Sequence, residues 1–204
     1  MIGIICPSTF EFDHLNIVNQ DADIDIICSG MGKVRAALAC HHLVNRNTQL
    51  DYILLIGFAG ALSPTLAIGD LIEPTNFIEQ DYNAEPLESF PNRVKRAPFK
   101  KLHSEAKDAV MLTQDRFLTH NPYTDLASQP GYESIACDME SYAVAYCSQE
   151  LKIPFSALKF ISDNADSDAD HDFLGNCERL APKFNATVNE AIQTIQQRLV
   201  NKVS

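Results

Sequence analysis

Two carboxyl side chains follow apolar segments of the chain and are candidates for acid–base chemistry. Glu11 comes shortly after Ile2–Cys6, and Asp163 follows Phe155–Ile161. Burial beside an apolar strand favours the protonated form of a carboxyl group, whereas an ionised carboxylate can activate water. An acid and a carboxylate together are what the cleavage of a glycosidic bond requires. The alternatives are a turn-capping aspartate and a glutamate at a helix N-terminus.

Glycines and small residues follow two further apolar runs. The segment Ser29–Lys33 contains Gly-Met-Gly, and Gly57–Gly60 reads Gly-Phe-Ala-Gly. Small residues leave backbone N–H groups uncovered, so that a ligand can approach the main chain closely. A tight turn without a ligand is equally compatible with the pattern at Gly57–Gly60.

The elements that would position these residues alternate between strands and helices. Near-continuous apolar strands are typical of a sheet that is covered on both faces. Helical spacing of apolar residues predicts helices from Gly32 to His42, over Met139–Leu151, and from Pro182 onward. The predicted fold is a single-domain three-layer α/β/α sandwich over residues 1–204, around a mixed, mostly parallel twisted sheet. The predicted strands are Ile2–Cys6, Ile24–Cys28, Ile53–Ile56, Asp70–Ile78, Val110–Thr113 and Phe155–Ile161.

The order of the elements predicts where a site would form. Ligands of such sheets bind at the carboxyl ends of the strands. Glu11, Ser29–Lys33, Gly57–Gly60 and Asp163 each follow a predicted strand, so we expect them to converge. The proline-containing stretch Asn83–Pro98 is predicted to be a long mobile loop of the kind that serves as a lid or an interface.

Composition excludes several classes of protein. The chain has 204 residues and a net charge of −11, which disfavours nucleic-acid binding. No apolar run reaches the roughly 20 residues of a membrane span, and the first residues do not resemble a signal peptide. The 6 cysteines lie singly in apolar segments, which favours reduced thiols in the cytoplasm.

Four motifs follow one another along the chain: Ser29–Ala37, Gly57–Asp70, Asp138–Glu140 and Ile161–Asp166. In this order they resemble the purine nucleoside phosphorylase superfamily. Within it, the methylthioadenosine/S-adenosylhomocysteine nucleosidases are the branch that the chain resembles most. The resemblance extends from Ile2 to the final helix and implies purine nucleoside hydrolysis, with a place in methionine salvage.

The resemblance assigns the catalytic roles residue by residue. Cleavage of a ribosyl–purine bond develops positive charge on the sugar and negative charge on the base. The family's counterpart of Asp163 protonates the purine, with Ser162 orienting it, and the counterpart of Glu11 activates water. Glu140 is the family's ligand of the ribose hydroxyls, and Met139 packs beside the sugar or base.

Further residues are expected to bind the substrate. Phe117 matches a phenylalanine that stacks on the purine, and Leu118 matches a residue whose backbone meets the base edge. Without the resemblance, Phe117 would be interpreted as a core residue. The remaining expected contacts are Ser8, Met31, Phe58, Ala59, Gly60 and Lys159.

Two of these positions depart from the nucleosidase pattern. Phe58 stands where that branch has serine, and Lys159 stands where it has arginine. Both family residues help to hold the attacking water, and lysine keeps the charge but not the planar fork. The water site is therefore rebuilt here, or the substrate or rate differs. A polar or cationic 5′ substituent is as compatible with the sequence as methylthio.

Two functional alternatives to a hydrolase remain on the sequence alone. A phosphorylase would need arginines beside the glycine segments, and Arg35 is the arginine nearest to one. A nucleoside-binding member without activity is the second alternative to a hydrolase. The acidic run Asp163–Asp172 lacks the glycine and closing glutamate of a calcium loop, so no metal and no cofactor are expected. The expected partners are a small-molecule purine nucleoside and a second copy in a homodimer, with neither nucleic acid nor membrane.

Overall fold

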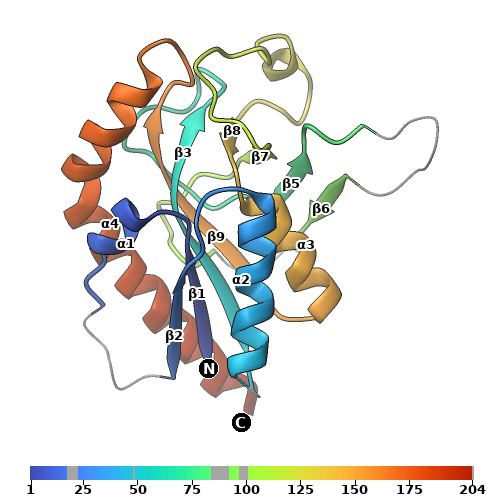
Figure 1. Cartoon of the computed structure of the whole chain (residues 1–204), viewed down its shortest axis with the longest axis vertical. Helices are drawn as coiled ribbons and strands as arrows, with labels where there is room; N and C mark the ends of the chain where they lie inside the picture. Colours follow the sequence, from blue (N-terminus) through green and yellow to red (C-terminus); the bar gives the residue numbers. More distant parts are fainter. Residues whose placement is uncertain (18–22, 48, 84–91, 97–100, 204) are drawn as a thin grey trace.

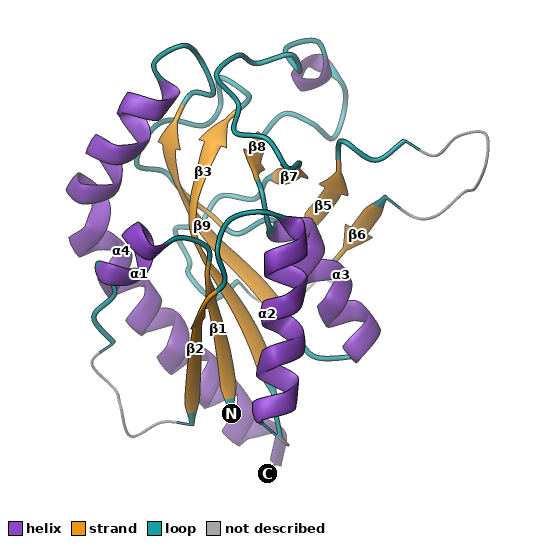
Figure 2. Cartoon of the chain, in the orientation of Figure 1, coloured by secondary structure: helices purple, strands orange, loops and turns teal. Residues whose placement is uncertain are grey.

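A mixed sheet forms the centre of the molecule (Figures 1 and 2). The computed structural model describes residues 1–17, 23–47, 49–83, 92–96 and 101–203, without the side chains of 202 and 203. In this part of the chain the sheet has nine strands, in the order β2-β1-β3-β8-β7-β5-β6, with β9 pairing β3 and β4. The strands are β1 (Ile2–Cys6), β2 (Ile24–Cys28), β3 (Tyr52–Ala61), β4 (Leu71–Ile72), β5 (Asn76–Glu79), β6 (Arg93–Lys95), β7 (Val110–Thr113), β8 (Ile135–Asp138) and β9 (Phe155–Asp163).

Most strand pairs run parallel, as the sequence predicts. The pairs β1–β2, β1–β3, β3–β9, β5–β7 and β7–β8 are parallel. The pairs β3–β8, β4–β9 and β5–β6 are antiparallel. β3 pairs with β1 along its first half, with β9 from Ile53 to Gly60, and with β8 at its far end. The carboxyl end of β3 therefore lies where the loops that follow the central strands converge.

Helices cover both faces of the sheet. α2 (Lys33–Arg46) and α3 (Ser141–Leu151) lie side by side on one face, and α4 (Ala169–Val203) covers the other, with the short α1 (Thr9–Asp13) beside it (Figure 1). A 3₁₀ turn occupies Leu126–Ser128. Ile53 and Leu55 belong to the core under α2 and α3, whereas Leu54 and Ile56 belong to the core under α4. This alternation is the period of two of a strand buried on both faces. The predicted α/β/α sandwich is confirmed.

Several predicted boundaries are wrong, for identifiable reasons. The last helix begins at Ala169, and Pro182 lies inside it rather than near its start. The predicted strand Asp70–Ile78 is split into β4 and β5, because Pro74 between them has no N–H to donate to a ladder. Gly57–Gly60 is a continuation of β3 and not a turn.

Two strands, β6 and β8, were not among the predicted ones. β6 lies within Asn83–Pro98, so that stretch is not one continuous loop; residues 84–91 and 97–98 lie outside the described residues. None of the described helices combines the length and the apolar character that crossing a bilayer requires.

Candidate active site

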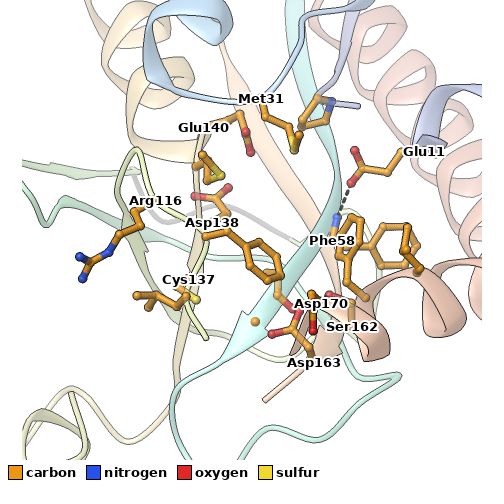
Figure 3. Close-up of a pocket in the computed structure, with 18 residues that line it drawn as sticks. Glu11, Met31, Phe58, Arg116, Cys137, Asp138, Glu140, Ser162, Asp163 and Asp170 are labelled. Carbon is orange, nitrogen blue, oxygen red and sulfur yellow. Dashed lines mark hydrogen bonds between the residues drawn. The ribbon is translucent and has the colours of Figure 1, made fainter. Parts of the chain in front are cut away.

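A cavity of about 420 Å³ opens at the carboxyl ends of the central strands (Figure 3). All of the predicted site residues except Ser8 and Lys159 line it, and they come from segments that are far apart in the sequence. The structure therefore brings Glu11 and Asp163 to one cavity. The lining residues are Pro7, Glu11, Met31, Phe58, Ala59, Gly60, Arg116, Phe117, Leu118, Cys137, Asp138, Met139, Glu140, Ser162, Asp163, Asp170, Phe173 and Leu174.

Hydrogen bonds to both carboxylate oxygens hold the Glu11 side chain in place. It is the third residue of α1, and a reciprocal capping box forms between its side chain and Ser8, the N-cap. The Ser8 backbone N–H and hydroxyl donate to Oε2 at 2.9 and 2.6 Å. The backbone N–H of Phe58 donates to Oε1 at 2.9 Å (Figure 3). Ser8 thus lies behind Glu11 instead of lining the cavity, which corrects its predicted placement.

Asp163 ends β9 and is 3% exposed. The Ser162 hydroxyl donates to Oδ2 at 2.7 Å, and the Ala165 N–H donates to Oδ1 at 2.9 Å. Burial raises the pKa of Asp163, and the two hydrogen bonds only partly oppose that rise. A Cβ atom at Gly60 would lie 2.8 Å from Oδ1, so the glycine leaves room for this carboxyl group.

Glu140 lies at the start of α3, in a group of buried charges. The Gly32 N–H donates to its Oε1 at 2.9 Å. Burial raises the pKa of Glu140 to about 7; the nearby Lys159 ammonium opposes the rise, and the Asp138 carboxylate adds to it. Burial also raises the pKa of Glu11, against the effects of Lys159 and of its hydrogen bonds.

Lys159 is completely buried on β9 and lies outside the lining of the cavity. Its ammonium is 3.2 Å from Oδ2 of Asp138 and 3.7 Å from Oε2 of Glu140, which are ion-pair distances without hydrogen-bond geometry. Burial lowers the pKa of Lys159, but the carboxylates of Asp138, Glu140 and Glu11 outweigh it and raise the pKa overall. Its predicted direct contact with substrate is therefore corrected to a position behind Glu140.

Asp138 is a site residue that the sequence analysis did not single out. Its carboxylate accepts hydrogen bonds from the Thr113 hydroxyl at 2.8 Å and from the Ser141 N–H at 3.1 Å, and it pairs with Lys159. The signal was present in the motif Asp138–Glu140, but only the carboxylate two residues later was assigned a role. Asp138 holds the first turn of α3 and the ammonium together.

Aromatic side chains form the apolar wall of the cavity. Phe117 is 41% exposed and meets the edge of Phe173, their ring centroids 6.0 Å apart. Phe58 stacks on Phe184 at 5.3 Å and also contacts Phe160 and Phe173. Its ring thus packs toward α4, while its backbone N–H faces Glu11. Phe173, with Asp170 and Leu174, was missed because the predicted helix began at Pro182.

The acidic run after Asp163 spans the turn that precedes α4 and the first turn of that helix. Asp170 lines the cavity, and Asp166 and Asp168 are exposed. Among the described residues, no group of three or more His, Cys, Asp or Glu side chains is arranged to hold a metal ion.

Comparisons with known proteins place this arrangement in context. Residues 18–193 match the model of the Phosphorylase superfamily. The chain is 29% identical over 192 residues to the 5′-methylthioadenosine/S-adenosylhomocysteine nucleosidase of Buchnera aphidicola subsp. Schizaphis graminum, covering 86% of this chain and 81% of that protein. Among solved structures, the Helicobacter pylori 5′-methylthioadenosine/S-adenosylhomocysteine nucleosidase superimposes with a TM-score of 0.80 and 21% identity, covering 94% of this chain and 97% of that one. The Helicobacter pylori futalosine hydrolase gives a TM-score of 0.79 and 20% identity over 94% and 97% of the two chains.

The structural neighbours share the fold, and the family model matches most of the chain. The order of the glycine segments, the Asp138–Glu140 motif and the Ser162–Asp163 pair agrees with that match. This chain belongs to the Phosphorylase superfamily.

Proposed function

We propose that this protein hydrolyses the N-glycosidic bond of a purine nucleoside, with adenine as the base. The observation that carries the proposal is that Glu11 and Asp163, which are far apart in the chain, line one cavity together with Glu140. An acid for the leaving base and a carboxylate for the water are the two groups that this reaction needs. The curated relatives that match the chain, named as methylthioadenosine/S-adenosylhomocysteine nucleosidases, support the same reaction.

Asp163 acts as the general acid. Burial raises its pKa, which favours the protonated form, and the Ser162 hydroxyl orients the carboxyl group. Donation of that proton to the purine ring neutralises the charge that develops on the base as the bond to ribose breaks. Phe117 stacks on the base, and the backbone of Leu118 meets its edge.

Glu11 activates the attacking water. The hydrogen bonds from Ser8 and from the Phe58 N–H fix its carboxylate without any help from a side chain at position 58. The Phe58 ring therefore does not remove the support of the water-activating group. The buried Lys159 ammonium stabilises the ionised carboxylates of Asp138, Glu140 and Glu11, and it does not contact the water directly.

Glu140 binds the ribose hydroxyls, and Met139 packs beside the sugar. The Gly32 N–H and the Lys159 ammonium hold Glu140 toward the cavity. A carboxylate that accepts from two adjacent hydroxyls fixes the ring while positive charge develops on it.

Water is favoured over phosphate as the nucleophile by the charge of the cavity. Its lining contains the carboxyl groups of Glu11, Asp138, Glu140, Asp163 and Asp170, whereas Arg116 is its one cationic residue among the described ones. The Arg116 side chain points away from the centre of the cavity (Figure 3). A phosphate dianion needs fixed cations close by, so this lining favours water.

The test is base release from methylthioadenosine and adenosine with and without phosphate. A hydrolase releases adenine and free sugar at the same rate in both conditions. Sugar 1-phosphate that forms only when phosphate is added would establish phosphorolysis instead. Saturable binding of these nucleosides without any base release over hours would identify a binding protein.

The proposal extends to assembly and compartment. Met31, Val34 and Leu38 are exposed apolar residues on one side of the Gly-Met-Gly segment and α2, and Tyr146 and Leu151 are exposed on the neighbouring α3. An apolar surface of this kind marks a protein–protein interface, and we assign it to a homodimer. All 6 cysteines are free thiols, which supports the cytoplasm as the compartment.

A further inference from the structure

Charged contacts centred on Lys33 join three segments of the chain, two of which carry the cavity-lining residues Met31 and Arg116. The Lys33 ammonium is 2.8 Å from Glu79 at the end of β5 and 2.5 Å from Asp81 in the turn that follows. It is also 3.9 Å from Asp115, which lies after β7. We call Lys33, Glu79, Asp81 and Asp115 the Lys33 clamp. Its members take no part in the proposed acid–base chemistry.

Backbone N–H groups of the clamp also donate hydrogen bonds to its carboxylates. The Lys33 N–H donates to Oδ1 of Asp115 at 2.7 Å, and the Asp115 N–H donates to Oδ2 of Asp81 at 2.9 Å. The other oxygen of Asp81 accepts from the Lys33 ammonium. Burial raises the pKa of Asp81, but the hydrogen bonds from the Lys33 ammonium and the Asp115 N–H outweigh this effect, so the pKa is lowered overall.

The clamp also supplies a cap that the sequence of α2 lacks. Gly32 is the N-cap residue and has no side chain to accept a hydrogen bond from the first turn. The Asp115 carboxylate, from a different loop, accepts the N–H of Lys33 in its place. A Cβ atom at Gly32 would lie 3.1 Å from Oδ1 of Asp115, and Gly32 has φ +104°, so glycine permits this close approach.

Two successive N–H groups therefore face two different carboxylates. The Gly32 N–H donates to Glu140, and the Lys33 N–H donates to Asp115. Asp115 directly precedes the cavity-lining residues Arg116–Leu118. A displacement of Asp115 thus moves both the segment that carries Phe117 and the N–H that positions Glu140.

We propose that the Lys33 clamp is a positioning assembly, which fixes the spacing between the base-stacking segment and the ribose-binding carboxylate Glu140. Lys33 and Asp115 are its two positioning residues, and they act without touching the substrate. This inference rests on the proposed function. It adds that full activity requires the ion pairs of the Lys33 clamp, whose members do not line the cavity.

The test compares Lys33→Met with Lys107→Met. Lys107 forms an ion pair of 2.6 Å with Asp70 and lies outside the cavity lining, so its variant controls for the loss of a comparable pair. Each variant is assayed with methylthioadenosine and with its 2′-deoxy analogue. Misplacement of a binding group by about 1 Å can cost on the order of 10²-fold in rate. We expect Lys33→Met to lose about that factor in kcat/KM, and Lys107→Met to stay within about twofold.

The ratio of kcat/KM for the two substrates separates positioning from a loss of folded protein. Partial unfolding lowers both values equally and leaves the ratio unchanged. A displaced Glu140 interacts less with the 2′-hydroxyl, so the ratio of kcat/KM for methylthioadenosine to that for its 2′-deoxy analogue falls below the wild-type ratio in Lys33→Met and in Asp115→Ala. Lys33→Arg keeps the positive charge and restores most of the ratio. An unchanged ratio in Lys33→Met, with an active wild-type enzyme, overturns the inference.

If the wild-type protein releases no base, the proposed function is refuted but the clamp is not. Amide hydrogen exchange then tests the clamp without an activity assay. The amides of Gly32 and Lys33 then report the clamp directly, because each donates to a carboxylate. Faster exchange at both amides in Lys33→Met, but not in Lys107→Met, supports the positioning role. Wild-type exchange at Gly32 in Lys33→Met rejects it.

Discussion

At the scale of single residues, the site consists of carboxyl groups in surroundings that differ. Burial raises the pKa of both Asp163 and Glu11, but a buried ammonium, that of Lys159, opposes the rise at Glu11. Groups whose surroundings separate their protonation behaviour can serve as the acid and the base of one reaction. The assigned roles therefore depend on the proton at Asp163.

Asp163→Asn is expected to abolish base release while the protein remains folded. An amide keeps the shape of the side chain but has no acidic proton, and general acid catalysis contributes about 10²–10⁴-fold. Steady-state adenine release and nucleoside binding measure the two effects, and binding should persist. Asp166→Asn, at an exposed neighbouring position, serves as the control and should keep wild-type activity. Undiminished base release by Asp163→Asn would refute the proposed acid.

The raised pKa of Glu140 predicts a pH dependence of stability. Between its ordinary value of 4.5 and about 7, the folded protein binds the proton more tightly than the unfolded chain does. The free energy of unfolding therefore decreases as the pH rises through this window. Glu11 and Asp163 have raised pKa values too and contribute with the same sign.

Glu140→Gln is expected to flatten this decrease and to be more stable than the wild type above pH 7, while it binds nucleoside more weakly. Urea unfolding at a series of pH values measures the effect. Glu150→Gln, an exposed position on α3, should keep the wild-type slope. If the two variants show the same slope, Glu140 is not the group that titrates.

At the scale of elements, β3 and α4 together build the apolar wall. The Phe58 side chain from β3 packs among Phe160, Phe173 and Phe184, of which the last two belong to α4. The same residue uses its N–H for Glu11. Phe58 thus packs against α4 with its ring and holds the Glu11 carboxylate with its backbone N–H.

Phe58→Ala and Phe117→Ala form a pair that separates packing from binding. Phe58 is 6% exposed, so its truncation should lower the free energy of unfolding by about 3–5 kcal/mol. Phe117 is 41% exposed, and its truncation should change stability by less than about 1 kcal/mol while raising KM. Denaturant unfolding and steady-state kinetics measure both quantities. Equal losses of stability would contradict the assignment of Phe117 to the cavity.

The last helix shows why element boundaries were hard to predict. Proline is favoured in the first turn of a helix, so Pro182 was interpreted as a start. In the folded chain α4 begins at Ala169, and the residues before Pro182 pack against the end of the sheet and line the cavity. Tertiary packing of Phe173 and Cys177 outweighs the local preference of the proline.

At the scale of the whole molecule, the exposed apolar stripe on α2 predicts assembly. Val34 is 78% exposed, and Leu38, one helical turn further along, is 51% exposed. If the proposed homodimer forms through this stripe, Val34→Glu converts it to monomer, since the substitution places a charge in the apolar surface. Analytical ultracentrifugation measures the mass.

Val200→Glu provides the matched control, because Val200 is 69% exposed on α4, the helix that covers the opposite face of the sheet from α2. It should leave the dimer intact. A monomeric wild-type protein, or dissociation by both variants, would contradict an interface at α2.

The sequence by itself determined the class of fold and the main chemical groups, since both depend on local patterns. Apolar runs marked β1, β2 and β7 to the residue, the ordered motifs pointed to Glu140 and Asp163, and the count from the first strand pointed to Glu11. Only the tertiary structure decided which charges meet. Lys33 and Asp115 are 82 residues apart, and Lys159 lies beneath Asp138 and Glu140 instead of in the cavity. Such contacts arise when distant segments pack together, and the spacing of residues along one segment carries no record of them.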